Sequence, residues 1–428
     1  MKIIVNTARV LVGALFIFSG LVKAIDPLGL AYKMQEFFEV WARDGYLLSL
    51  MNWFYEHALL FSVIMITLEV VLGIALLLGS FKKLVSWLLL LLMLFFTFLT
   101  SYVLFSGKIR ACGCFGDCIP LTPEQTFTKD IVLLVLVLLI IFGQKYIQPL
   151  FRKAVSLALI IVSLMAVVML QWYVLKHLPL KDCLPYKIGN NILELRKMPK
   201  DAVPDKYDYA FVYEKGGVKK EFRVDSLPDE TQWTFVERKQ VLVEKGKNNV
   251  PLINDFNLKQ TNTLLVYQKD TLTSTFEPSA LPDSSWTFVE NKEEVADVTN
   301  EVLSYKGTYY MLFINDPANI PDGWEKDLEV FLALGKKGAR MIIVTANYKD
   351  VYKRYTGYLA SKGKMPNDQQ QNLNKAIGWA ENIPHPVVLT SDVTAIKTAA
   401  RNNVTLFLMD GPVVKNKWGG NDIEKALK

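Results

Sequence analysis

The sequence predicts a helical membrane bundle followed by an exported α+β region. Two observations lead to this fold class. Hydrophobic residues make up 51% of the 428 positions and the mean hydropathy is +0.21, whereas a soluble chain of this length rarely averages apolar. The apolar residues also gather in five long stretches before residue 177, and ordinary globular composition follows. Length alone allows two or three domains.

Five apolar stretches have the length of membrane-spanning helices. At about 1.5 Å of rise per residue, roughly 20 residues cross a hydrocarbon core of about 30 Å. We therefore expect a four-helix membrane domain over residues 1–150 and a fifth spanning helix over 151–180. The expected spans are Ile4–Ala24, Ala58–Gly79, Leu84–Phe105, Ile131–Ile147 and Val155–Val174.

The basic residues of the short loops orient these spans. Three segments carry Lys or Arg and no acid: the N-terminus, the turn between spans two and three, and the loop between spans four and five. We therefore expect a cytoplasmic N-terminus and an outside location after about residue 177, as in a bacterial inner-membrane protein with periplasmic domains. The basic residues are Lys2, Arg9, Lys82, Lys83, Lys145, Arg152 and Lys153.

The outer segment 25–57 is predicted to contain an amphipathic helix, because apolar residues recur in it at helical spacing. The helix either lies in the membrane interface or packs over the bundle, and both alternatives place it at the outer surface. The apolar residues are Leu30, Met34, Phe37, Phe38 and Trp41, and an aromatic run Trp53–Tyr55 follows them.

Glu69 lies near the middle of the second span. An ionisable group at this depth is costly, so it is a candidate functional residue. Lys23, at the outer end of the first span, is its candidate partner. The alternative is a structural role, either as an ion pair or as a protonated acid bonded to a neighbouring helix.

Cys112, Cys114 and Cys118 fall within seven residues of the second outer loop, and Cys183 follows the fifth span. The predicted orientation places all four cysteines on the oxidising side, where disulfides persist. A disulfide between Cys112 and Cys114 would close a small, strained ring that is easily reduced. Cys118 could then resolve it by exchange.

Three interpretations of these cysteines stay open. They form a redox relay, with Lys108 and Arg110 favouring the thiolate. They form a structural disulfide that braces the loop. They bind a metal, although this spacing is not a common zinc pattern. We expect the relay and no metal, with Cys114–Cys118 as the least strained pair within the loop. The candidate site is Cys112, Cys114 and Cys118, with Cys183, Glu69 and Lys23 as accessory residues.

The first 150 residues resemble the DoxX and MauE families of bacterial membrane proteins. Phe16–Lys23 followed by Asp26-Pro27 looks like the start of DoxX-type proteins, and Glu69–Gly73 fits the same pattern. Cys112–Gly116 resembles the cysteine motif of the MauE family. The resemblance implies a four-helix membrane protein linked to periplasmic disulfide chemistry during the maturation of exported enzymes. It does not extend to the fifth span or beyond.

Residues 181–295 contain an internal repeat. Val212–Lys215 matches Val266–Lys269, and Trp233–Glu237 matches Trp286–Glu290. Each copy reads as three short strands, and we expect two small β modules that pack together. The aromatic residues are expected to form their cores.

Residues 296–428 alternate strands and helices and end in a hairpin and a last helix, an order that resembles thioredoxin-like domains. A redox thioredoxin carries Cys-x-x-Cys after its first core strand, and this place reads Asn315–Pro321. Val404-Thr405 replaces the proline expected before a later strand. Because the domain lacks these features, we expect a docking domain without thiol chemistry of its own. A helix is expected over Gln369–Glu381, and His385 is expected to be a loop residue.

Two hypotheses about function follow. In the first, the loop cysteines exchange electrons with exported proteins and, through the bundle, with a quinone. In the second, the chain is a non-enzymatic assembly factor of an envelope or secretion complex, and its cysteines are structural. A nucleic-acid partner is not expected, because residues 178–428 hold 34 Lys and Arg against 33 Asp and Glu. A transporter is disfavoured, because one intramembrane acid does not make a transport path.

Overall fold

The computed structural model describes residues 1–109, 113, 115–244, 246–276, 282–315, 324–362 and 386–428. Within this part of the chain, five helices are long and apolar enough to cross a membrane, which confirms the predicted spans. They are α1 (Lys2–Ala24), α4 (Ala58–Leu78), α5 (Lys82–Ser106), α6 (Pro123–Phe142) and α7 (Lys153–Lys176).

Helix α6 begins eight residues before the predicted fourth span. Thr122 and Gln125 form a capping box at its start, and Pro123 occupies its first turn. These residues favour the start of a helix but are polar. A span predicted from apolar residues alone therefore begins after them. The shift matters because it brings Asp130 inside the helix, where it is buried.

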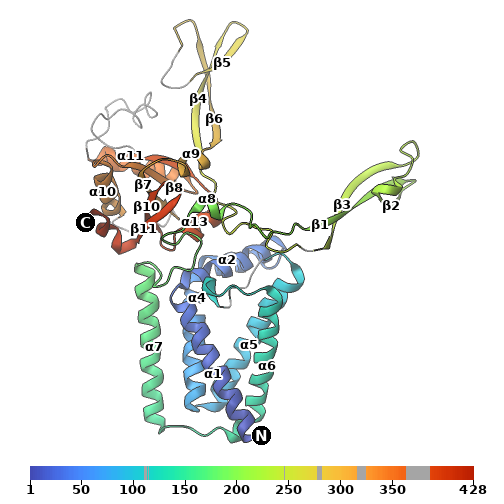
Figure 1. The fold of residues 1–428 in the computed structure, drawn as a ribbon, viewed down its shortest axis with the longest axis vertical. Coiled ribbons are helices and arrows are strands. Elements are labelled where there is room, and N and C mark those ends of the chain that lie inside the picture. The colour runs from blue at the N-terminus through green and yellow to red at the C-terminus, as the bar shows by residue number, and fades with distance from the viewer. Residues whose placement is uncertain (110–112, 114, 245, 277–281, 316–323, 363–385) are drawn as a thin grey trace.

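Helices α1, α4, α5 and α6 form a bundle with one continuous apolar core, and α7 stands beside it against α4 (Figure 1). The short helix η2 (Gln144–Tyr146) and a loop lead from α6 to α7. Gln171 of α7 donates to Thr67 of α4 at 2.9 Å. The core residues include Val12, Phe16, Leu76, Leu89, Met93 and Val137.

Helices α1 and α4 approach each other closely at glycines. A Cβ atom added to Gly73 would lie 2.9 Å from the carbonyl oxygen of Gly13 and 2.9 Å from Cγ1 of Ile17. Gly20 has the same property, since its added Cβ would lie 2.5 Å from Cγ2 of Val70. This close contact brings the outer half of α1 against the middle of α4.

We expect Gly73→Ala to lower the melting temperature of the purified protein, because the added methyl group overpacks the α1–α4 contact and costs about 1–3 kcal/mol. Gly357 in helix α11 (Tyr348–Ser361) is the matched control, because its added Cβ meets nothing within 4 Å. Gly357→Ala should leave the melting temperature unchanged or raise it, since alanine has the higher helix propensity. Equal melting curves for Gly73→Ala and the wild type would contradict the packing argument.

Two helices cover the end of the bundle opposite the N-terminus (Figure 1): α2 (Pro27–Arg43) and α3 (Leu48–Glu56). Asp26 caps α2 by accepting a hydrogen bond from the Gly29 amide at 3.2 Å. The predicted apolar stripe buries Leu30, Met34 and Phe37 against the bundle. The structure thus shows the packing arrangement for this helix. The cysteine loop, residues 107–122, lies at the same end and contains the short helix η1 (Gly116–Cys118).

The C-terminal region is built on an eight-stranded sheet of order β11-β10-β7-β8-β9-β4-β5, with β6 also paired to β4. Strands β7 (Thr308–Ile314), β8 (Arg340–Thr345) and β9 (Val387–Thr390) are parallel. The hairpin of β10 (Val404–Asp410) and β11 (Val413–Gly419) runs antiparallel to β7.

Helices pack on this sheet and enclose apolar clusters with it. These elements confirm the predicted alternation of strands and helices, while His385, the helix expected over 369–381 and residues 316–321 lie outside the described residues. The helices are α8 (Ile192–Leu195), α9 (Thr299–Leu303), α10 (Trp324–Gly335), α11 (Tyr348–Ser361), α13 (Val393–Ala399) and η4 (Gly420–Leu427).

The internal repeat is present, but its two copies do not pack together as expected. Strands β1 (Lys206–Lys215), β2 (Val218–Arg223) and β3 (Thr234–Glu244) form a separate sheet, and η3 (Val224–Ser226) lies within this copy. Strands β4 (Lys259–Lys269), β5 (Leu272–Phe276) and β6 (Thr287–Asp297) extend the large sheet, because Lys259 pairs with Thr390. The two copies project as arms in different directions (Figure 1).

Each arm has its own small aromatic cluster. In the first arm, Phe222 stacks edge-on against Tyr213 at 5.8 Å and Trp233 at 5.2 Å. In the second arm, Phe276 makes the same contacts at 5.8 and 5.4 Å with the equivalent Tyr267 and Trp286. The predicted core role holds only in part, because Phe235 and Phe288 of the same repeats are 51% and 49% exposed.

Candidate functional site

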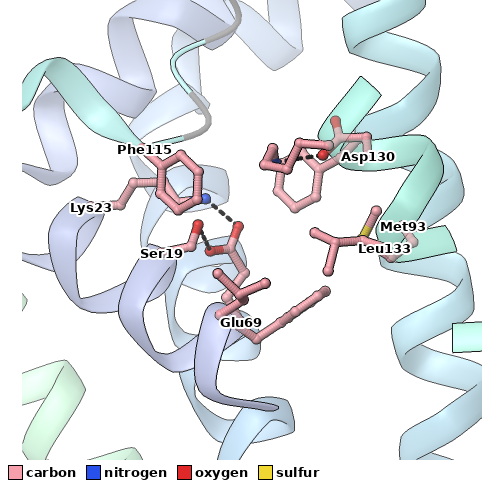
Figure 2. Close-up of a pocket in the computed structure, with 11 residues that line it drawn as sticks. Ser19, Lys23, Glu69, Met93, Phe115, Asp130 and Leu133 are labelled. Atoms are coloured by element: carbon pink, nitrogen blue, oxygen red, sulfur yellow. Dashed lines mark hydrogen bonds and ion pairs between the residues drawn. The ribbon is translucent and has the colours of Figure 1, made fainter. Parts of the chain in front are cut away.

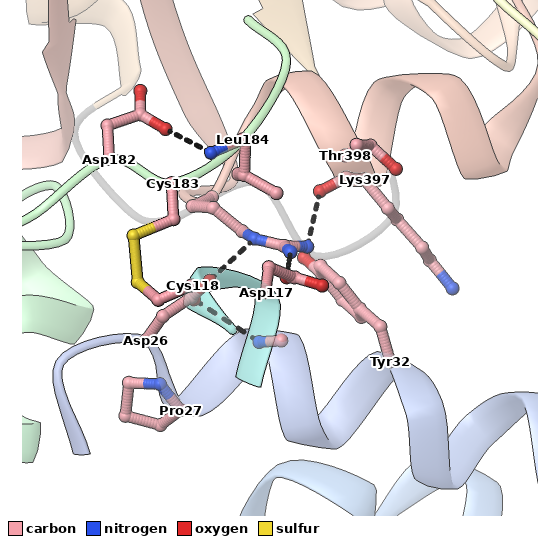
Figure 3. A network of polar contacts seen from close by, with 12 residues as sticks. Asp26, Pro27, Tyr32, Asp117, Cys118, Asp182, Cys183, Leu184, Lys397 and Thr398 are labelled. Carbon is pink, nitrogen blue, oxygen red and sulfur yellow. Dashed lines mark hydrogen bonds and ion pairs between the residues drawn. A yellow bond between two sulfur atoms is a disulfide. The ribbon is translucent and has the colours of Figure 1, made fainter. Parts of the chain in front are cut away.

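The structure joins Cys118 of the cysteine loop to Cys183, just after α7, by a disulfide with a Cα–Cα distance of 4.9 Å (Figure 3). The pairing of Cys114 with Cys118 favoured from the sequence is therefore not the one observed. The spacing of cysteines within the loop did not decide the partner of Cys118, because Cys183, just after α7, lies next to the loop. Cys112 and Cys114 lie outside the described residues.

The disulfide lines a small pocket between the membrane bundle and the segment that leads into the C-terminal region. Both cysteines are half-buried, so the bond is partly accessible from outside. Gly116 has a φ angle of +59°, which lets the loop turn above Val22 at the end of α1. The pocket is lined by Val22, Asp26, Gly29, Gly116, Asp117, Cys118, Pro179, Lys181, Asp182, Cys183 and Leu184.

An arginine of the C-terminal region lies beside this disulfide. Arg401 donates from Nε to Asp26 at 2.9 Å and from Nη2 to Asp117, and Nη1 donates to the Lys397 carbonyl at 3.0 Å. Its guanidinium also stacks over the Tyr32 ring at 5.4 Å. Only 7% of the Arg401 side chain is exposed, so this cation depends on its two carboxylate partners.

The two cysteines share a sequence feature. Each follows an aspartate, in Asp117-Cys118 and Asp182-Cys183. Asp117 pairs with Arg401, and Asp182 accepts from Lys417 at 2.7 Å, with 4% of the Lys417 side chain exposed. Both cations come from the C-terminal region. The repeated Asp-Cys dipeptide was the one sign of this arrangement in the sequence. The basic partners of the two aspartates lie more than 200 residues further along the chain, so they could not be identified from the dipeptide.

Burial shifts the protonation of this cluster. Burial raises the pKa of Asp26, the Arg401 charge opposes that shift, and the nearby Asp117 reinforces it. Burial also lowers the pKa of Lys417, against the attraction of Asp182. The cluster therefore holds its charges only while the acidic and basic partners stay together.

Further contacts tie the C-terminal region to the outer helices. Asn315, directly after β7, donates to the Tyr32 hydroxyl at 2.7 Å. Lys397 of α13 donates to Gln35 at 2.8 Å and to the Tyr55 hydroxyl at 3.4 Å. The carboxyl end of β7 and helix α13 thus face α2, and Arg401 after α13 reaches Asp117 of the cysteine loop.

The predicted pair of Glu69 and Lys23 is confirmed. Lys23 donates to one oxygen of Glu69 and Ser19 donates to the other at 3.2 Å. Both charged residues are 2% exposed. Figure 2 shows that they face Asp130 of α6 across a pocket of the bundle. Lys129 and Thr100 donate to Asp130 at 2.5 and 3.1 Å.

Asp130 is not among the site residues predicted from the sequence, because the predicted span begins at the next residue. Phe115 of the cysteine loop lines this pocket. The Lys129 ammonium lies 5.1 Å from the centre of the Phe115 ring, and the centre of the Phe18 ring lies 6.0 Å from it. The intramembrane charges and the cysteine loop are therefore neighbours. Lys108 is predicted from the sequence to favour a cysteine thiolate. Among the described contacts it pairs instead with Asp44 at 2.6 Å. Arg110 lies outside the described residues.

Comparison with known proteins places this site in a family context. Residues 1–143 match the model of the methylamine utilisation protein MauE, and residues 207–245 match a domain of unknown function, DUF8463. Protein TlpB of Flavobacterium psychrophilum is 33% identical over 139 residues, which are 32% of this chain and 36% of that protein. The chain thus spans about a third of this relative. No solved structure matches the chain. Residues 1–143 therefore form a MauE-type membrane domain, and the comparisons assign no family to the rest of the chain beyond the match at residues 207–245.

Proposed function

We propose that this membrane protein carries out thiol–disulfide exchange with exported proteins during their maturation. The observation that carries the proposal is the half-buried Cys118–Cys183 disulfide, which lines a pocket at the junction between bundle and C-terminal region. A client thiolate would attack one sulfur and release the other as a thiolate. Cys112 and Cys114 lie close by in the sequence and supply the further thiols of a relay.

The proposal includes a location at the outer face of a bacterial inner membrane. The basic short loops favour a cytoplasmic N-terminus, and five spans then place the cysteines and the C-terminal region in the periplasm. A reporter that is active only in the cytoplasm, fused after Lys428, should therefore be silent. The same reporter after Leu150, between α6 and α7, is the positive control. Strong activity after Lys428 would contradict the orientation and the oxidising location of the cysteines.

The C-terminal domain, residues 296–428, acts in this proposal as a thioredoxin-like docking domain. Its β7–α10–β8 unit and its antiparallel β10–β11 hairpin favour that assignment. It contains no cysteine, so it contributes contacts and no electrons.

A quinone is the proposed electron acceptor, because client oxidation yields two electrons that the disulfide must pass on. The pocket under Phe115 is the candidate place for it. Lys23 has ammonium protons beyond the one given to Glu69, Glu69 and Asp130 are carboxyl groups that can transfer protons, and Met93 and Phe96 are among the apolar walls. A quinone accepts two electrons and two protons.

Thiol trapping of the wild type and of each Cys→Ser variant, followed by mass spectrometry, tests this function. Cys114→Ser should accumulate a mixed disulfide with an exported protein or leave client proteins reduced, because the relay is interrupted while the Cys118–Cys183 bond stays available. A chain that is fully oxidised in every condition, without mixed species, would contradict the relay.

The second candidate function is a non-enzymatic assembly factor. The buried Arg401 contacts favour it, because together with the disulfide they brace the C-terminal domain on the bundle in a fixed position. In that case the cysteines would be structural, and the arms would bind a partner complex.

A further inference from the structure

We propose that the aspartates beside the disulfide form a docking site for basic side chains of a client thiol protein, and that Arg401 and Lys417 occupy it until a client arrives. This inference rests on the proposed thiol exchange and names the chemistry by which a client is recognised. Its basis is that both cysteines carry the same acidic neighbour and both acids hold a cation from the C-terminal domain.

The geometry fits recognition of a cation. Asp26 and Asp117 converge on one guanidinium, and Tyr32 presents its ring to the same group. Two carboxylates and an aromatic face form a favourable site for arginine. Asp117 keeps 36% of its side chain exposed, and Asp182 keeps 26%. An incoming basic residue can therefore reach both acids from outside.

The position of the cations makes the C-terminal domain a competitor. Arg401 lies between α13 and β10, Lys417 lies on β11, and the carboxylates that they bind, Asp117 and Asp182, line the pocket that contains the disulfide. A client that replaces these cations by its own would displace that end of the domain. The same step places the client's thiol at the Cys118–Cys183 bond.

The exchange itself is balanced without a further reagent. The client thiol loses its proton and attacks one sulfur of the disulfide. A mixed disulfide forms, the Cys118–Cys183 bond breaks, and the released thiolate takes up a proton.

Two synthetic peptides test the inference on the purified full-length protein in detergent. Each has a single cysteine, flanked in one peptide by arginines and in the other by glutamines. The rate of mixed-disulfide formation is followed by acid quenching and mass spectrometry. In Arg401→Gln, the arginine peptide should react on the order of tenfold faster than with the wild type, because its competitor has been removed. The glutamine peptide should change little.

Adding Asp117→Asn to Arg401→Gln should abolish the preference for the arginine peptide. Arg223→Gln, at the end of β2, is the matched control and should leave both rates unchanged. Lys417→Gln is a second, independent variant that should shift the rates in the same direction if Arg401→Gln does not fold. Equal acceleration of both peptides, or no acceleration, would overturn the inference.

Failure of the proposed thiol exchange can be distinguished from failure of the docking site. If neither peptide nor 2-mercaptoethanol forms a mixed disulfide with the wild type or any variant, the disulfide is inert, and thiol exchange is wrong together with the docking site. If 2-mercaptoethanol reacts and the peptides show no charge preference, thiol exchange survives and the docking site is wrong.

Discussion

Cys183→Ser is expected to lower the free energy of unfolding by about 4 kcal/mol. The disulfide closes a loop with a sequence separation of 65 residues, and a cross-link over such a loop removes chain entropy from the unfolded state in roughly this amount. Thermal unfolding of the purified protein in detergent, followed by circular dichroism, measures the loss. The loop contains α6 and α7, so the whole outer junction should loosen.

The matched comparison is Cys118→Ser, which removes the same bond. The two single variants and the double variant should show the same loss, because both residues act as one unit and their effects are not additive. The wild type under full reduction should approach the variants. Additive losses, or a loss only in Cys118→Ser, would contradict the Cys118–Cys183 pairing.

Glu69→Ala is expected to destabilise the bundle by about 3–5 kcal/mol, because it leaves the buried Lys23 ammonium without its carboxylate partner. The double variant Lys23→Met with Glu69→Leu should lose much less, since replacing a buried ion pair by apolar residues of similar size is often nearly neutral. The melting temperatures of the three proteins measure this difference.

The same variants separate a structural from a functional role of the ion pair. If the double variant is stable and exchanges thiols normally, the pair is structural, and the proposed electron acceptor does not need it. If it is stable but cannot reoxidise its cysteines, the pair serves the electron acceptor. A double variant as unstable as Glu69→Ala would contradict the ion-pair argument itself.

Most of the fold could be predicted from the sequence, because it depends on local patterns. The five spans and the β7–β11 region follow from hydrophobic stretches and alternation, which neighbouring residues determine. The pair Lys23–Glu69 was also predictable, since each charge lies within or at the end of a span and only a few partners are available. The start of α6 was predicted late, because its first turns are polar.

The remaining parts of the site depend on contacts between distant segments. The bond from Cys118 to Cys183 requires knowing where α7 ends relative to the loop, and nothing in the loop itself encodes it. Arg9 shows the same limit: it was interpreted as a cytoplasmic charge, but it donates to the carbonyls of Leu76 at 2.8 Å and Gln148 at 3.3 Å. The Arg401 contacts likewise depend on how the C-terminal domain sits on the bundle.

The two arms have a consequence for self-association. In the two arms, β2, β3, β5 and β6 are sheet edges, and β3 and β6 are exposed along all 11 of their residues. Long exposed edges of this kind invite pairing with the edges of other chains. Charged side chains on these strands, such as Lys219 to Glu221 and Lys292 to Glu294, oppose that pairing. At the crowded surface of a membrane, these charges would keep neighbouring copies from joining into continuous sheets and leave the arms free for a strand of complementary charge.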